Sequence, residues 1–193
     1  EVVCVDKDQS KIDALLNGKM PIFEPGLDQL VAANVAAGRL RFTTDLAEGC
    51  AEAEAVFIAV GTPSRRGDGH ADLSYVYAAA REIGAAIKGH TIVVTKSTVP
   101  VGTGDEVERI LRDVNPQGDF AVVSNPEFLR EGAAIGDFKR PDRIVIGSED
   151  ARATEVMEQL YRPLYRNRSA LVVMSRRGAE LTKYAAHAFL ATK

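Results

Sequence analysis

The chain has no tryptophan, two cysteines and few aromatic residues of any kind. Each of these shortages argues against a particular class of protein. Cys4 and Cys50 are too few for a disulfide framework and lack metal-ligand spacing, so we expect a reducing, cytoplasmic setting and no metal. Aromatic residues make up 6% of the chain and the net charge is −3, which argues against a nucleic-acid partner. No apolar run approaches the ~20 residues of a membrane span, so we expect no membrane partner.

The sequence also lacks the glycine fingerprint of dinucleotide-binding folds. That fingerprint, G-x-G-x-x-G, normally joins the first strand to the first helix. Gly67-Asp68-Gly69 and Gly102-Thr103-Gly104 both lack the third glycine and the preceding strand. Residues 1–6 already have the apolar, β-branched character of a strand. We therefore expect this chain to be a fragment whose first strand and phosphate loop lie before residue 1.

Apolar runs alternate with helical patterns along the chain, which predicts a doubly wound parallel α/β sheet of the Rossmann type. The expected strands are residues 1–6, 40–44, 55–60, 91–95, 120–124, 143–147 and 170–174. The expected helices are residues 11–16 after a Ser10 cap, 27–37, a short one after an Asp45 cap, 73–87, 101–113, 151–161 and 175–193. We assign residues 1–176 to one N-terminally incomplete nucleotide-binding domain. Residues 177–193 are expected to start a long connecting helix that leads to a next domain.

The absent first strand gives a testable expectation about the sheet. In a 3-2-1-4-5-6 strand order it lies between the strands at residues 1–6 and 55–60. These two strands should then be two strand spacings apart, roughly 10 Å, and should not be hydrogen-bonded to each other.

The densest chemistry lies in residues 124–132, Ser-Asn-Pro-Glu-Phe-Leu-Arg-Glu-Gly, directly after a buried strand. Asn125 suits a helix N-cap and Pro126 the first helical position, so a helix is expected to start here. Glu127 and Glu131 would then share one helical face. Carboxylates at the carboxyl end of a sheet strand are placed for catalysis. The alternative is a pair of solvated glutamates on a surface helix.

Three further features should meet the same edge of the sheet. Asp6 ends an early strand, where an acid binds the adenosine ribose of NAD and repels the 2′-phosphate of NADP; a turn-capping aspartate is the alternative. The turns at residues 60–63 and 96–100 follow buried strands and either approach a ligand or are ordinary connections. Lys183 and His187 lie four residues apart on the last expected helix. The alternative for Lys183 is a solvated surface charge.

Together, these motifs resemble the nucleotide-sugar dehydrogenases of the UDP-glucose/GDP-mannose dehydrogenase family. The matching stretches are residues 5–6 with 10–12, 21–27, 57–63, 96–103, 124–132, 141–147 and 179–186. The resemblance implies oxidation of a sugar C6 hydroxyl to a carboxylate through two hydride transfers to NAD. It also implies a homodimer joined through the helix that begins near Gly178. The expected substrate is UDP-glucose; GDP-mannose, a UDP-N-acetyl sugar and a non-catalytic nucleotide-binding module are the alternatives.

The resemblance implies a role for each matching residue. Thr98 would hold a catalytic water, Glu127 would be the acid/base of thioester hydrolysis, and Lys183 would stabilise the developing oxyanion. In a partly dry site we expect the pKa of Glu127 to be raised towards neutrality. The residues implied to contact NAD are Asp6, Lys11, Thr62, Ser97 and Glu131.

The residues implied to contact the substrate are Phe128, Leu129 and His187. At the position of His187 the family pattern has Asn, whose side chain is a neutral amide, whereas a histidine can titrate. The family's nucleophilic cysteine belongs to a later domain, and neither Cys4 nor Cys50 matches it.

Overall fold

The computed structural model describes residues 1–67, 69–165 and 171–192. Residue 170, expected to start the last strand, and residue 193, expected to end the last helix, lie outside them. The strands are β1 (Val2–Val5), β2 (Leu40–Thr43), β3 (Ala55–Ile58), β4 (Thr91–Thr95), β5 (Phe120–Ser124), β6 (Ile144–Gly147) and β7 (Leu171–Met174). The helices are α1 (Gln9–Leu16), α2 (Leu27–Ala36), α3 (Leu46–Cys50), α4 (Ser74–Ala86), α5 (Thr103–Val114), α6 (Ala134–Lys139), α7 (Ala151–Tyr161) and α8 (Arg176–Ala191), with a 3-10 turn η1 (Arg162–Leu164).

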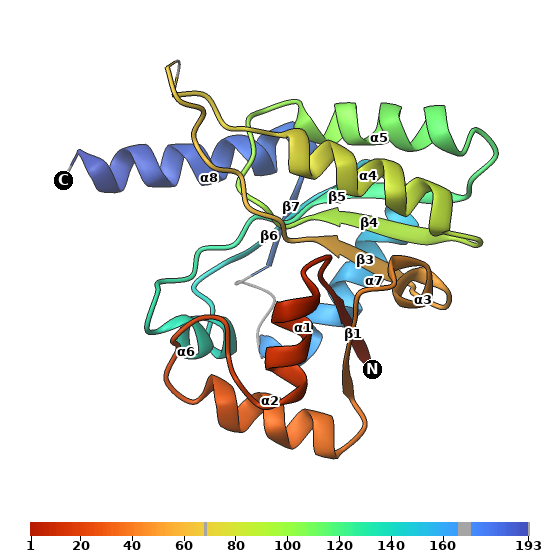
Figure 1. The fold of residues 1–193 in the computed structure, drawn as a ribbon. Coiled ribbons are helices and arrows are strands. Elements are labelled where there is room, and N and C mark those ends of the chain that lie inside the picture. Colours follow the sequence, from red (N-terminus) through yellow and green to blue (C-terminus); the bar gives the residue numbers. More distant parts are fainter. Residues whose placement is uncertain (68, 166–170, 193) are drawn as a thin grey trace.

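The strands form a Rossmann-like sheet that is interrupted where a strand was expected to be absent. β1 pairs with β2 in parallel, and β3-β4-β5-β6-β7 form a second group. In the described residues β1 and β3 are not hydrogen-bonded to each other, as expected. Figure 1 shows β1, with α1 and α2, set apart from the rest of the sheet.

One strand pair departs from the expected parallel arrangement. β5 and β6 meet in an antiparallel contact at Ser124 and Gly147, whereas β6 and β7 pair in parallel. A parallel pair needs a full crossover connection, usually a helix that packs back on the sheet. The only helix between β5 and β6 in the described residues is the six-residue α6. The sheet is therefore mostly parallel, and an α/β Rossmann-like fold is confirmed.

Helices cover both faces of the central strands. β4 and β5 are buried along their whole length, as expected for apolar strands in the middle of a sheet. On one face Val93 and Val122 pack under α4 and α5, which lie side by side (Figure 1). On the other face Val94 and Val123 pack against α7 through Met157. This rigid centre fixes the carboxyl ends of β3, β4 and β5.

One of two predicted helix caps differs from the structure. The cap of α1 is Asp8 and not Ser10, because the Asp8 carboxylate accepts from the backbone N–H of Ser10 at 2.9 Å. The helix consequently begins two residues earlier than predicted. Asp45 caps α3 as predicted, and its side chain accepts from the N–H groups of Ala47 and Glu48.

The helix predicted directly after β5 is wrong. Residues 125–130 are irregular, and the next helix, α6, begins only at Ala134. Asn125 cannot cap a helix because its side chain is used elsewhere. It is 1% exposed, it donates to the carbonyl of Val145, and it accepts from the hydroxyl of Tyr161. Glu127 and Glu131 therefore do not share a helical face.

The last helix, α8, is capped by Ser175, whose hydroxyl accepts from the N–H of Gly178 at 3.2 Å. It packs on β5 and β6 at its start and then leaves the body of the molecule (Figure 1). Beyond that packing it exposes large apolar side chains such as Phe189 and Leu190. Neither α8 nor any other helix in the described part of the chain is long and apolar enough to cross a membrane.

Candidate functional site

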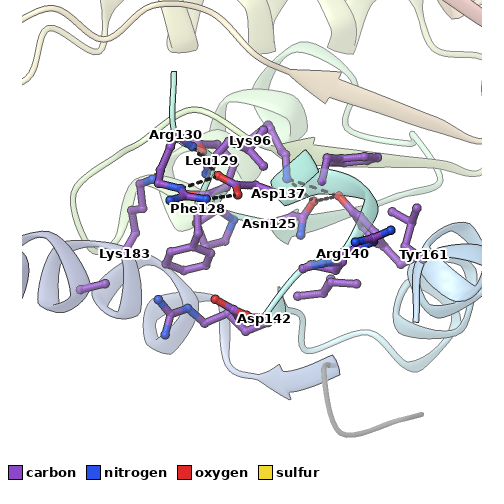
Figure 2. Close-up of a pocket in the computed structure, with 18 of the residues that line it drawn as sticks. Lys96, Asn125, Phe128, Leu129, Arg130, Asp137, Arg140, Asp142, Tyr161 and Lys183 are labelled. Atoms are coloured by element: carbon purple, nitrogen blue, oxygen red, sulfur yellow. Dashed lines mark hydrogen bonds and ion pairs between the residues drawn. The ribbon is translucent and has the colours of Figure 1, made fainter. Parts of the chain in front are cut away.

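A cavity of about 530 Å³ lies beyond the carboxyl end of β5. Its walls are the irregular segment after β5, the loop before β6, the end of α7 and one side of α8 (Figure 2). Ligands in open α/β sheets bind at this edge. Phe128, Leu129 and His187, the three residues expected to meet the substrate, all line the cavity.

Lys183 and Glu127 form an ion pair in the wall of this cavity. The Lys183 ammonium donates to the Glu127 backbone carbonyl and, at 3.0 Å, to the Glu127 carboxylate. It also lies 5.2 Å from the centre of the Phe128 ring. The Lys183 side chain is only 4% exposed and that of Glu127 is 32% exposed. A solvated surface lysine is therefore excluded for Lys183.

The pKa of Glu127 moves in the direction opposite to our expectation. Burial raises the pKa of this carboxyl, but three stabilising partners outweigh burial and lower it below its ordinary value. The backbone N–H of Leu129 donates to the carboxylate at 2.5 Å, Lys183 donates to it, and the charges of Lys183 and Lys96 stabilise its ionised form. Our prediction of a raised pKa is wrong for this arrangement because it left out these donors. Glu127 is therefore ionised near neutral pH and can accept a proton.

Thr98 lies beside a second, much smaller cavity. This space of about 10 Å³ is bordered by Ser97, Thr98 and Lys183, among others. A polar cavity of this size is close to the minimum for one water molecule. The turn after β4 therefore meets α8, at Lys183, around a space of about the size of a single water molecule.

Asp6 lies at the carboxyl end of β1, as predicted. Its carboxylate lies 3.1 Å from the ammonium of Lys11 and accepts from the N–H of Asp8 at 2.9 Å. An ionised carboxylate has about four acceptor sites, so capacity remains for the hydroxyls of a ribose. The two residues expected on the adenosine side are thus in contact with each other.

The turns after β3 and β4 are joined by the predicted hydroxyl groups. The Thr62 hydroxyl donates to the carbonyl of Thr98 at 2.9 Å, and the Ser97 hydroxyl donates to the carbonyl of Val60 at 2.7 Å. A Cβ added at Gly61 would meet no atom within 4 Å, so this turn borders open space. An acid after β1, a turn after β3 that borders open space and a turn after β4 bonded to it fit a bound dinucleotide along one edge of the sheet.

Not every predicted residue reaches the cavity. Glu131 is exposed in the turn that precedes α6 and lines neither of the two cavities described above. The helical face that Glu127 and Glu131 were predicted to share does not form, so Glu131 does not line the large cavity with Glu127. Cys4 and Cys50 also line neither cavity, and burial raises the pKa of both thiols. Neither cysteine is placed as a nucleophile.

Our sequence reasoning missed Glu180, which fixes the position of α8. Its buried carboxylate accepts from the N–H of Gly102 at 2.6 Å and from the N–H of Gly104 at 2.7 Å. Gly102 is the N-cap of α5 and brings no side chain of its own, so Glu180 caps that helix from a distance. Because Lys183 follows Glu180 by one turn, this cap also sets where the Lys183 ammonium lies. The only signal in the sequence was a helix start without a capping side chain.

Replacement of Glu180 by alanine should destabilise the domain by about 3 kcal/mol, because two buried N–H groups lose a charged acceptor. For a domain of this size that lowers Tm by roughly 6–12 °C, measured by thermal unfolding of the full-length protein. Glu180→Gln is the matched control. Its single amide oxygen can serve one of the two N–H groups, so its Tm should fall between the other two. Equal Tm values for all three proteins would contradict the capping role.

Comparisons with known proteins agree with this geometry. Residues 1–165 match the model of the UDP-glucose/GDP-mannose dehydrogenase family, NAD binding domain. The whole chain aligns, at 71% identity, with 45% of UDP-glucose 6-dehydrogenase from Rhizobium meliloti, and at 52% identity with 43% of the enzyme of that name from Pseudomonas aeruginosa. The chain thus spans less than half the length of these relatives.

Two solved structures share the fold closely. One is a UDP-glucose dehydrogenase from Pyrobaculum islandicum, with 44% identity and a TM-score of 0.93 over 98% of this chain and 44% of that one. The other is a GDP-mannose dehydrogenase from Pseudomonas aeruginosa, with 38% identity and a TM-score of 0.94 over 100% of this chain and 45% of that one. The backbone therefore matches two enzymes named for different sugars equally well.

Proposed function

This chain belongs to the UDP-glucose/GDP-mannose dehydrogenase family as its NAD-binding domain, and we propose that the full-length protein oxidises UDP-glucose to UDP-glucuronate. The reaction removes two hydrides from C6 of the sugar, and NAD supplies the acceptor for both. The observation that carries the proposal is the ion pair of Lys183 and Glu127 in the wall of a cavity at the carboxyl edge of the sheet. Identity to relatives named UDP-glucose 6-dehydrogenase favours that sugar over GDP-mannose and UDP-N-acetyl sugars.

The geometry gives each residue a task. The buried ammonium of Lys183 stabilises the negative charge that develops on the substrate oxygen, which is a transition-state interaction. After the second hydride transfer the sugar is held as a thioester on the cysteine of the later domain. Thr98 holds the water that attacks this thioester, the ionised Glu127 accepts a proton from that water, and the cysteine leaves as a thiolate. The backbone at Phe128 and Leu129 and the side chain of His187 border the sugar nucleotide.

The cofactor side has its own residues. Asp6 binds the adenosine ribose and Lys11 holds the Asp6 carboxylate in place. Thr62 and Ser97 join the two turns along which the dinucleotide lies. Glu131 contributes to the same cofactor from the turn before α6.

Turnover of the full-length protein tests this proposal. We expect NADH absorbance to rise when UDP-glucose and NAD are present together, with two NADH formed for each sugar oxidised. GDP-mannose and UDP-N-acetyl sugars serve as competing substrates and should be slower. Binding of nucleotide sugar without turnover of any of them would contradict the proposal and favour a non-catalytic nucleotide-binding module.

We also propose that residues 177–193 begin a helix that connects the NAD-binding domain, residues 1–176, to the next domain and joins two subunits in a homodimer. The exposed side chains of Leu181, Phe189 and Leu190 on α8, which are 57%, 63% and 68% exposed, support an apolar contact there. Sedimentation equilibrium of the full-length protein tests this, and a monomer at micromolar concentration would contradict it.

Asp6→Asn should weaken NAD binding by about tenfold, because the ribose hydroxyls lose a charged acceptor. It should weaken NADP binding less or strengthen it, because the repulsion of the 2′-phosphate is removed. Titration of the full-length protein with NADH and with NADPH, followed by the fluorescence of these reduced cofactors, measures both affinities. Asp28→Asn, at an exposed carboxylate in the first turn of α2, is the matched control and should change neither.

A further inference from the structure

Lys96 is a half-buried cation to which the mechanism above gives no role. It follows β4 directly, and its ammonium lies in the wall of the 530 Å³ cavity. It donates to the Asn125 side-chain oxygen at 3.2 Å and to the Tyr161 hydroxyl at 3.3 Å. Both partners are neutral, and no carboxylate forms an ion pair with Lys96 within residues 1–67, 69–165 and 171–192. Burying a charge without a counter-charge is costly.

The neutral partners hold the ammonium in one place. Asn125 is anchored by its donation to the carbonyl of Val145 at 2.8 Å, and the Tyr161 hydroxyl donates to Asn125 at 2.5 Å. The Lys96 ammonium also lies 5.8 Å from the centre of the Tyr161 ring. Figure 2 shows Lys96, Asn125 and Tyr161 together, with Lys183 reaching in from α8 on the other side. The charge is therefore preorganised.

Lys96 interacts through space with both members of the ion pair. The pKa of Lys96 is lowered to about 8, chiefly by burial; the charge of Glu127 opposes this shift and the charge of Lys183 adds to it. In turn the charge of Lys96 lowers the pKa of Glu127. The other charged or titratable residues that line the cavity are Arg130, which pairs with Asp137, and Arg140, Asp142, Arg143 and His187.

We propose that Lys96 is a positioning residue for the reaction, whose fixed ammonium keeps Glu127 ionised when Lys183 turns from Glu127 to the substrate oxygen. Lys183 cannot donate fully to a developing oxyanion and to the Glu127 carboxylate at the same time. The backbone N–H of Leu129 remains on Glu127, but it carries no full charge. Lys96 supplies the second positive charge, and its hydrogen bonds to the neutral Asn125 and Tyr161 keep it from forming a direct ion pair with Glu127. This inference rests on the proposed function for its role in turnover.

The test compares three variants of the full-length protein. Lys96→Met removes the charge and the hydrogen bonds, Lys96→Gln removes the charge and keeps a hydrogen-bonding group, and Lys96→Arg keeps the charge. We expect the acidic limb of the pH profile of kcat to rise by about 0.5–1 pH unit in the Met and Gln variants. In Lys96→Arg it should stay close to wild type. An unmoved limb in Lys96→Met, or a wild-type limb in Lys96→Gln, would overturn the proposal.

Two readouts are independent of turnover. The Glu127 carboxyl, labelled with carbon-13 and assigned by the signal lost in Glu127→Gln, should titrate at higher pH in Lys96→Met than in wild type. Thermal unfolding should show a Tm for Lys96→Met equal to wild type or higher, because a half-buried charge without a counter-charge is removed. A lower Tm with an unmoved Glu127 titration would mean that Lys96 is structural only. If wild type shows no turnover, the proposed function fails, while the Glu127 titration still decides the role of Lys96.

Discussion

Replacing Lys183 by methionine in the full-length protein is expected to lower kcat by a factor of about 100 to 1,000, the usual cost of losing one preorganised donor to a developing oxyanion. The ammonium is nearly fully buried, so its charge acts with little screening by water. Because this interaction forms chiefly in the transition state, KM for the nucleotide sugar should change far less than kcat. Steady-state NADH formation measures both constants.

The same substitution should also move the pH profile. Lys183 is among the groups that lower the pKa of Glu127, so its removal raises that pKa and shifts the acidic limb of the profile to higher pH. Lys88→Met is the matched control, since Lys88 is exposed and lines neither cavity described above. It should leave kcat and the pH profile unchanged. A Lys183→Met enzyme that kept wild-type kcat would remove Lys183 from the chemistry.

The elements that the sequence predicted well are those set by local patterns. Apolar runs located β4 and β5, and periodic stretches located α4, α5 and α7 to within about two residues. In the described residues β1 and β3 are also not hydrogen-bonded to each other, as predicted from the strand order typical of this fold.

The errors lie where tertiary contacts override local preference. Asn125-Pro126 reads as a helix start, yet Asn125 is buried and bonded to Val145 and Tyr161, which lie far along the chain. The side chain of the buried Asn125 also accepts a hydrogen bond from Lys96, which lines the large cavity. Glu180 and Lys96 were missed because their partners, such as Gly102 for Glu180, are distant in sequence. The lowered pKa of Glu127 depends on Leu129 and Lys183 reaching one carboxylate together, which no spacing in the sequence reveals.

Glu127→Gln is expected to separate oxidation from hydrolysis in the full-length protein. The amide keeps the shape of the side chain but cannot accept a proton, so hydrolysis should slow by a factor of about 100 to 10,000. In the proposed mechanism the two oxidation steps do not use this base. NADH should then appear in a rapid burst of two equivalents per active site, followed by a slow steady rate. Stopped-flow absorbance measures the burst, and the acidic limb of the steady-state pH profile should disappear.

Binding of NAD should be nearly unaffected in Glu127→Gln, because Glu127 faces the large cavity and not the edge formed by Asp6, Thr62 and Ser97. Glu52→Gln, at an exposed carboxylate outside both cavities, is the matched control and should show no burst. A slow enzyme without a burst would place Glu127 in the oxidation steps, whereas an unchanged rate would remove it from the reaction. The burst is therefore decisive, since only a base that acts after both hydride transfers leaves them fast.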